Sequence, residues 1–181
     1  MRAGSATSRS CSTACAPADG LPVFVIQKHA ATSLHYDFRL EVDGVMRSWA
    51  VPKGPSYDPA ARRLAMAVED HPMSWNEFEG VIGPGYGAGT VIRWDEGEYR
   101  NTSDKPMAEA LDSDGYARFV LEGHKLKGEW SLRRMSGAEN QTSWLLSKRR
   151  DSDADPRRDV VTDSPESVVS GLTIEEVAEK G

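Results

Sequence analysis

The sequence predicts a mainly β protein, a compact β-barrel of short antiparallel strands with one or two short helices. Residues 34–42 alternate strictly between apolar and polar side chains, which is typical of a half-buried strand because successive side chains point to opposite faces. Several more short apolar segments follow, separated by turns that contain glycine. Little helix is expected between them, and short strands at this spacing favour a sandwich or a closed barrel.

The elements follow in order along the first half of the chain. A short apolar strand over 21–26 precedes the alternating strand over 34–42, and Asp43-Gly44 then predicts a tight hairpin because glycine tolerates positive φ. The returning strand covers 45–51 and ends before a loop with two prolines. A further strand over 63–72 is expected to present Arg63, Glu69 and His71 on one face.

The second half of the chain begins with five glycines and a proline in residues 80–89, predicted as a mobile rim or a close backbone approach to a phosphate. It lacks the nucleotide P-loop pattern. A second hairpin is expected around the turn Asp95-Glu96-Gly97, and one or two helical turns over 106–111. The last predicted elements are strands at 117–121, 128–135 and 144–148, and an amphipathic helix at 173–179 with Thr173 and Glu176 as a capping box.

The length of 181 residues, with 39% hydrophobic and 28% charged residues, suits one globular domain with tails. We predict a disordered leader over residues 1–20, a β-barrel domain over 21–150 and a polar tail over 151–181. Cys11 and Cys15 lie in the leader without a second pair, so neither a structural zinc site nor a disulfide framework is expected. The leader contains no apolar run, and the expected location is therefore the cytoplasm, with no membrane contact.

The formal net charge of −6 argues against non-specific polyanion binding by the whole molecule. Any nucleic-acid contact must then come from local basic clusters, each of which, taken alone, is more typical of a solvated strand end. The candidate clusters are Arg62-Arg63, Lys125 with Lys127, Arg133-Arg134 and Lys148-Arg149-Arg150.

The polar face of the 34–42 strand places His35, Asp37 and Arg39 in a row, about 6.5–7 Å apart. A lone His-x-Asp is more often part of an ordinary polar face, but His29 stands six residues upstream. Two imidazoles and a carboxylate make a three-ligand site for a divalent metal with open positions. Arg39 suits a bidentate grip on a phosphate held by that metal. The ligand types suit Mn²⁺, while Zn²⁺ and Fe²⁺ also fit.

The motifs in this chain resemble the 3′-phosphoesterase family, which occurs as a module of bacterial ATP-dependent DNA ligase D and as stand-alone proteins. The resemblance extends from Val23 to Arg150 in matching order. The matching blocks are Phe24-Val25-Ile26-Gln27-Lys28-His29, Leu34-His35-Tyr36-Asp37-Phe38-Arg39-Leu40-Glu41, Ser48-Trp49-Ala50-Val51-Pro52-Lys53-Gly54-Pro55, Val68-Glu69-Asp70-His71-Pro72, Phe78-Glu79-Gly80, Tyr86-Gly87-Ala88-Gly89-Thr90-Val91, Lys125-Leu126-Lys127-Gly128 and Trp144-Leu145-Leu146-Ser147-Lys148.

The resemblance implies a β-barrel enzyme that depends on Mn²⁺ and trims the 3′ ends of broken DNA. Such enzymes remove a terminal ribonucleoside and then the 3′-phosphate. The implied metal ligands are His29, His35 and Asp37, and the implied phosphate-binding and catalytic residues are Arg39 and His71. The positions implied to support the site or guide the substrate are Gln27, Lys53, Arg63 and Glu69. The implied partners are a primer-template, a DNA ligase, a polymerase and a Ku-type end-binding protein, in repair at the bacterial nucleoid.

The chain departs from the family pattern at three places. Trp75 stands four residues after His71, where the family usually has a tyrosine whose hydroxyl reaches the phosphate; an indole offers only an N–H donor. The leader lacks the family's acidic and basic residues, and Gly83-Pro84-Gly85 is shorter than the family segment. These departures put ribonucleoside removal and the phosphomonoesterase step in question.

Two other functions fit parts of the pattern. A non-haem iron oxygenase on a β-barrel would use His35-x-Asp37 with a distant histidine such as His71, but leaves Gln27-Lys28-His29, Lys53 and Arg63 unexplained. A non-catalytic DNA-end-binding module would account for Trp75 and the leader, although the proposed metal ligands are all present.

Overall fold

The structure is a computed structural model that describes residues 20–85, 88–136 and 142–181. The predicted leader, with Cys11 and Cys15, lies outside the described residues except for Gly20.

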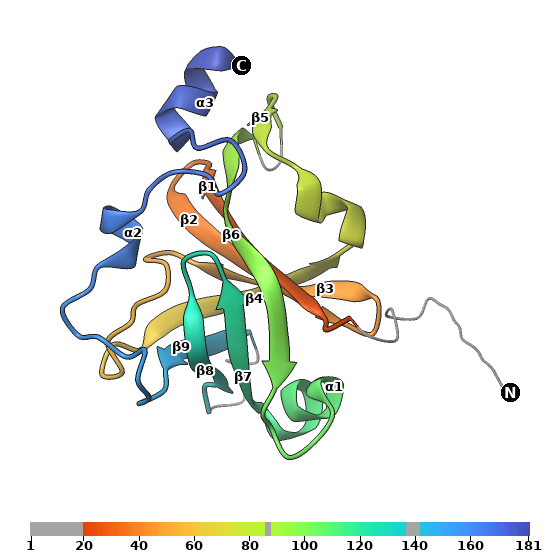
Figure 1. Ribbon diagram of the computed structural model, residues 1–181. Helices are drawn as coiled ribbons and strands as arrows, with labels where there is room; N and C mark the ends of the chain where they lie inside the picture. Colours follow the sequence, from red (N-terminus) through yellow and green to blue (C-terminus); the bar gives the residue numbers. More distant parts are fainter. Residues whose placement is uncertain (1–19, 86–87, 137–141) are drawn as a thin grey trace, which may run out of the picture.

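Eight antiparallel strands close into a barrel in the order β1-β2-β3-β4-β9-β8-β7-β6, because β6 returns to pair with β1 (Figure 1). The predicted β-barrel is therefore confirmed. The short β5 adds to the sheet beside β6. The strands are β1 (Val23–Ala30), β2 (Leu34–Val42), β3 (Val45–Val51), β4 (Arg63–His71), β5 (Gly80–Ile82), β6 (Gly89–Asn101), β7 (Tyr116–Gly123), β8 (Lys127–Arg134) and β9 (Ser143–Lys148).

The alternation in β2 sorts its side chains as the sequence predicts. Its apolar residues, among them Tyr36 and Phe38, are buried in the main core inside the barrel, so Asp37 and Arg39 face outward. The preceding strand is longer than expected: β1 continues past residue 26 to Ala30, since it pairs with β2 on one side and β6 on the other along its whole length. That extension places Gln27 and His29 on a strand beside β2.

The hairpin at Asp43-Gly44 is confirmed. Both residues have positive φ, 52° and 86°, which is the turn geometry that matches the right-handed twist of the two strands. The turn fixes the β2–β3 register, in which Arg39 pairs with Ser48. The hairpin thus decides which β3 side chain lies beside Arg39.

The predicted hairpin around Asp95-Glu96-Gly97 is wrong, because residues 89–101 form one long strand, β6. The register of β1 against β6 shifts between Ile26 and Gln27, so a bulge replaces the expected turn. Asp95 is fully buried at this point and accepts backbone N–H bonds from residues 124–126 at 2.8–3.1 Å. Gly97 is required because a Cβ there would lie 2.1 Å from the Glu122 oxygen.

The core inside the barrel is rich in aromatic side chains. Phe38 stacks on Phe119 at 5.9 Å between centroids and lies 6.3 Å from Trp49. Trp49, Trp94 and Trp130 are all fully buried. Because β2 and β3 supply two of these contacts, the sheet that carries the outward Asp37 and Arg39 is packed firmly from within.

Short helical segments complete the chain. The predicted helical turn near 106–111 is confirmed as α1 (Met107–Glu109) continuing into the π-helical turn η2 (Ala110–Asp114). The 3₁₀ helix η1 (Met73–Glu77) follows β4. The helices of the last thirty residues are α2 (Val160–Asp163) and α3 (Ile174–Lys180), the second with the predicted capping box between Thr173 and Glu176. No helix in the described part of the chain has the length and apolar character needed to cross a membrane.

The C-terminal residues lie against the barrel (Figure 1). Val160 is part of the main core, while Ile174 and Val177 pack with Ile92 of β6 in a second cluster. The backbone oxygen of Ser164 accepts hydrogen bonds from Trp94 Nε1 and Lys125 Nζ, at 2.8 and 2.9 Å. The division of the chain into leader, domain and tail stays a prediction, but residues 160–177 contribute to both apolar clusters.

We predict that Asp95→Ala lowers the free energy of unfolding by about 3 kcal/mol, since it leaves the buried backbone N–H groups of Lys125 and Leu126, and that of His124, without their acceptor. Urea denaturation followed by tryptophan fluorescence measures the change. Asp104→Ala is the matched control, because the Asp104 side chain is 97% exposed. Equal stability of the two variants would contradict the role given to Asp95.

Candidate metal centre

The two histidines and the aspartate expected to bind metal come together on the outward face of β1 and β2. His29 pairs directly with His35 in the strand register, and their ring centroids lie 4.9 Å apart. Asp37 Oδ2 is 3.7 Å from His29 Nδ1, and Asp37 Oδ1 is 3.2 Å from His35 Nε2. One ligand atom from each residue lies within 4.8 Å of the other two. The structure therefore assembles the predicted cluster.

The donor set fits a divalent ion. Ligand atoms that share an ion at about 2.1 Å lie roughly 3–4 Å apart, which is close to the spacing seen here. His35 Nδ1 is 3.3 Å from the Ser33 oxygen, a contact that leaves Nε2 free to point toward Asp37. Two imidazoles and one carboxylate would leave coordination positions open for water and substrate. His29, His35 and Asp37 are thus the residues that could hold a metal.

The charge state of Asp37 also suits a cation. Burial raises the pKa of its carboxyl, but hydrogen bonds from His29 and His35 and the nearby Arg39 charge outweigh burial and hold the pKa well below its usual range. The same hydrogen bond with Asp37 raises the pKa of His35. Asp37 is consequently a carboxylate at all physiological pH values.

Arg39 lies next along the same face, and the residue is almost completely buried, with 3% of its surface exposed. Its Nε donates to Gln27 Oε1 at 2.8 Å, and Nη1 donates to Ser48 Oγ at 2.7 Å. Its Nη2 is 3.6 Å from Asp37 Oδ2. Burial lowers the pKa of Arg39, yet a guanidinium stays protonated under any physiological condition. A permanent, immobilised positive charge therefore stands beside the metal cluster.

Gln27 joins Arg39 to the wall of the site. This fully buried side chain accepts from Arg39 and donates through Nε2 to the backbone oxygens of Trp75 and Phe78, at 3.0 and 3.2 Å. Those two aromatic rings stack at 4.8 Å with an interplanar angle of 10°. Gln27 thus fixes the guanidinium and the η1 segment with a single amide.

His71 reaches the site because of a bulge in β4. Met46 pairs with His71 while Ser48 pairs with Val68, so β4 has one extra residue between them. This turns His71 toward Arg39, whose Nη1 lies 2.9 Å from His71 Nδ1. The same Nδ1 is 2.9 Å from the Glu69 oxygen. Burial first, and then the Arg39 charge, lower the pKa of His71.

The bulge also corrects the expectation that Arg63 shares a face with Glu69 and His71. Arg63 pairs with Leu146 and, like Ala65, lies on the core-facing side of β4. Simple alternation along β4 fails because the extra residue after Val68 reverses which side chains point outward in the rest of the strand. Lys53 lies in the exposed loop after β3. The structure does not bring Arg63 or Lys53 into the cavity, and their substrate roles stay predictions.

The three residues of the metal cluster, together with Arg39 and His71, line a cavity of about 760 Å³. Glu69 and Trp75 belong to its wall, and the glycine-rich segment contributes Ile82, Gly85 and Ala88. Residues 86–87 of that segment are outside the described residues. Ser48 is a partner of Arg39 that was not among the predicted site residues, although the Asp43-Gly44 turn already implied their pairing. The full lining is Gln27, His29, Ala31, Thr32, Ser33, His35, Asp37, Arg39, Ala50, Val68, Glu69, His71, Trp75, Ile82, Gly85, Ala88 and Val91.

Comparison with known proteins gives a match over the part of the chain that contains this cluster. The family model of the DNA ligase D 3′-phosphoesterase domain matches residues 27–134, which include the whole cluster described above. The chain belongs to the DNA ligase D 3′-phosphoesterase family. This membership does not favour the non-haem iron oxygenase that the His-x-Asp pattern left open.

The similar proteins are much longer multifunctional chains. A multifunctional non-homologous end joining protein LigD from Pseudomonas aeruginosa is 48% identical over 158 residues, 86% of this chain and 18% of the relative. LigD of Mycolicibacterium smegmatis is 42% identical over 133 residues, 71% of this chain and 17% of that protein. LigD of Mycobacterium tuberculosis is 44% identical over 117 residues, 63% of this chain and 15% of that protein. The chain thus spans less than a fifth of the length of these relatives.

We predict that Asp37→Ala weakens Mn²⁺ binding more than about 100-fold, because it removes the only carboxylate of the cluster. Calorimetric titration with Mn²⁺ measures the affinity. His124→Ala is the control, since His124 is exposed and is not part of the cluster. Unchanged Mn²⁺ affinity in Asp37→Ala would exclude this cluster as the metal centre.

Proposed function

We propose that this protein is an Mn²⁺-dependent phosphoesterase that processes DNA 3′ ends, removing a terminal ribonucleoside and then the 3′-phosphate. The observation that carries the proposal is the buried Arg39 guanidinium fixed beside a three-ligand metal cluster in one cavity. A phosphate ester repels an anionic nucleophile, so catalysis requires positive charge where its oxygens gain charge. Family membership supports phosphoester chemistry at this site.

The metal site would be formed by His29, His35 and Asp37. Bound there, a divalent ion supplies a Lewis acid for a phosphate oxygen and lowers the pKa of a bound water. Manganese is the proposed ion because mixed nitrogen and carboxylate ligands with open positions suit it.

Arg39 binds the scissile phosphate. Its Nε and Nη1 are engaged by Gln27 and Ser48, so the Nη2 edge toward Asp37 is the one that meets a phosphate beside the metal. The geometry is set before substrate arrives, which avoids reorganisation during the reaction.

His71 acts on the substrate through Nε2, because its Nδ1 already contacts Arg39 and the Glu69 oxygen. The lowered pKa favours the neutral imidazole near pH 7, which suits a hydrogen bond to a phosphate oxygen more than a resident positive charge. Gln27 positions Arg39, and Glu69 holds His71 through its backbone oxygen. Lys53, in the exposed loop after β3, is proposed to guide the DNA outside the cavity, and Arg63, on the core-facing side of β4, to support the site.

The biological setting is proposed as double-strand break repair by end joining, at the bacterial nucleoid in the cytoplasm. The relatives are named as non-homologous end joining proteins, and this chain matches only part of each. A DNA ligase, a polymerase and a Ku-type end-binding protein are therefore its proposed partners.

The deciding experiment is product analysis on a primer-template that ends in one ribonucleotide, with Mn²⁺ or with a chelator. We expect release of the ribonucleoside, then of phosphate, only with Mn²⁺. Arg39→Ala should lower kcat about 10²–10³-fold while keeping its Mn²⁺ affinity, since Arg39 contacts the phosphate and not the ion.

Other outcomes identify the alternatives. DNA binding without any product, with every divalent metal, would assign a non-catalytic end-binding module. Oxygen-dependent turnover of a 2-oxoacid with Fe²⁺ would assign an oxygenase. Normal turnover by Arg39→Ala would remove Arg39 from the phosphate site.

We predict that Trp75→Tyr increases phosphate release from a 3′-phosphorylated primer about tenfold, because a hydroxyl at this wall position adds a hydrogen bond to the phosphate. Steady-state phosphate release measures the effect. Trp75→Phe is the matched control, as it has the ring without the hydroxyl. If both variants release phosphate equally, a hydroxyl at position 75 is irrelevant.

A further inference from the structure

A second cavity, of about 420 Å³, lies on the outward face of β7, β8 and β9 and has no part in the chemistry described above. Four arginines line it, and they come from three separate places in the chain. Arg62 precedes β4, Arg133 is on β8, and Arg149 and Arg150 follow β9. Three of the four basic clusters noted in the sequence therefore meet in one place, which we call the arginine pocket.

The arginine pocket carries an excess of positive charge on a protein whose net charge is −6. Glu129 is the single carboxylate in its lining, 3.8 Å from Arg149 Nε. Among the described residues, no ion pair engages Arg62, Arg133 or Arg150. Lys148 adds nothing to the surplus, because its buried ammonium is bound to Asp151 Oδ1 at 2.5 Å.

The pocket is built from hydroxyl groups as well as charges. Ser131 and Ser147 face each other across β8 and β9 and both line it. The Arg133 guanidinium lies 4.2 Å from the centroid of the Tyr116 ring. Arg149 Nη1 donates to the Tyr116 hydroxyl at 3.2 Å. Tyr116 thus orders two arginines, and planar guanidinium groups beside hydroxyl donors are what phosphate contacts use.

The arginine pocket and the metal cavity lie near two points of the same strand, β4. Val68 of β4 lines the metal cavity, and Leu64, four residues earlier on β4, pairs with Leu145, which lines the arginine pocket. Four residues of strand span about 13 Å. Leu64 and Val68 are each 43% exposed, so the surface over this part of β4 presents apolar side chains to solvent. A DNA strand can cross it.

We propose that the arginine pocket binds backbone phosphates of the same DNA strand whose 3′ end lies in the metal cavity. The inference rests on the proposed function, since it places that 3′ end. It assigns the pocket to nucleic acid and not to an acidic protein, because the outward face of β4 leads from the arginine pocket to the cavity that contains Arg39. The site contributes affinity without base specificity.

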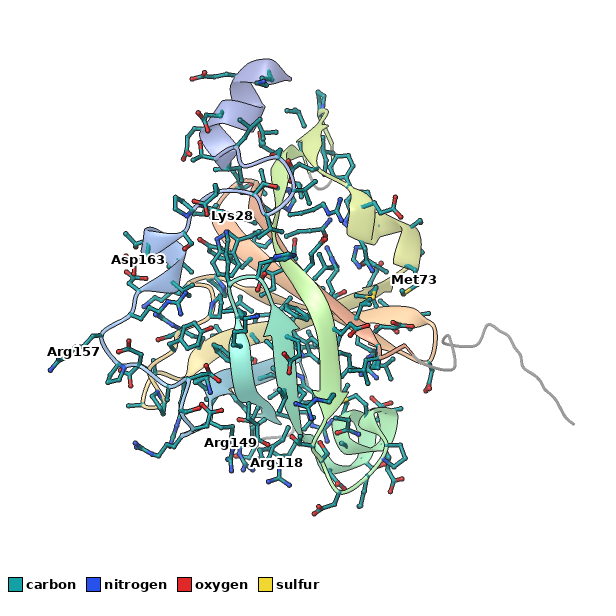
Figure 2. All side chains as sticks on the ribbon, in the orientation of Figure 1. Lys28, Met73, Arg118, Arg149, Arg157 and Asp163 are labelled. Atoms are coloured by element: carbon teal, nitrogen blue, oxygen red, sulfur yellow. The ribbon has the colours of Figure 1, made fainter. Side chains whose placement is uncertain are left out.

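The test compares Arg62→Glu and Arg133→Glu, singly and together, with Arg157→Glu. Arg157 is an exposed arginine of the tail, well away from Arg149 in Figure 2, and gives the same charge change outside the pocket. Fluorescence anisotropy in chelator measures binding of a single-stranded 3′-phosphorylated oligonucleotide. We expect the double variant to raise Kd about tenfold at low salt, and each lost contact to reduce the salt slope by about 0.7.

Turnover of a 3′-phosphorylated dinucleotide, which is too short to reach the pocket, should equal that of wild type in every variant. Equal Kd values in the double variant and Arg157→Glu would overturn the proposal. A loss of dinucleotide turnover in the double variant as large as its loss of oligonucleotide binding would also overturn it. The same holds if the double variant loses polyglutamate binding while its DNA binding stays intact. If the proposed function fails, the wild-type protein releases no product from any substrate. The binding measurement is made without metal, so it still tests the arginine pocket separately.

Discussion

The buried guanidinium of Arg39 is the constraint on which the site depends. A charge taken out of water is stable only when its donors are satisfied, and truncating one partner of such a group is strongly destabilising. Here the partners come from three different strands: Gln27 on β1, Ser48 on β3 and His71 at the end of β4. Holding one arginine therefore fixes the relative positions of four strands, since Arg39 itself belongs to β2.

The same constraint places the metal cluster. Asp37 precedes Arg39 by two residues on the outward face, so a register that seats Arg39 against Gln27 also sets Asp37 beside His29 and His35. The wall position of Trp75 follows as well, because Gln27 holds its backbone oxygen. The departure from the family's usual tyrosine consequently changes a side chain without changing the support beneath it.

Much of this arrangement could be predicted from the sequence, because it depends on strict alternation and on a tight turn. The outward row of His35, Asp37 and Arg39 follows from a period of two, and the Asp43-Gly44 hairpin follows from two adjacent residues, so both are local features of the sequence. The parts that were missed depend on bulges. One extra residue in β4 separates Arg63 from His71, and a bulge in β6 beside Asp95 stands where a hairpin turn was expected. A bulge depends on long-range pairing and buried acceptors, neither of which a single segment reveals. Likewise, the convergence of distant arginines required the strand order of the barrel.

Residues 160–177 pack on the barrel, which limits where the chain can be truncated. The family match ends at residue 134, yet Val160 fills the main core and Ile174 and Val177 cover Ile92. Ser167 and Ser170 donate to the two carboxylate oxygens of Glu79, just before β5, so the tail also tethers the segment that borders the metal cavity. A fragment trimmed to residues 27–134 would expose the apolar residues that the tail covers and would release one edge of the metal cavity. The packed unit is therefore larger than the stretch that the family model matches.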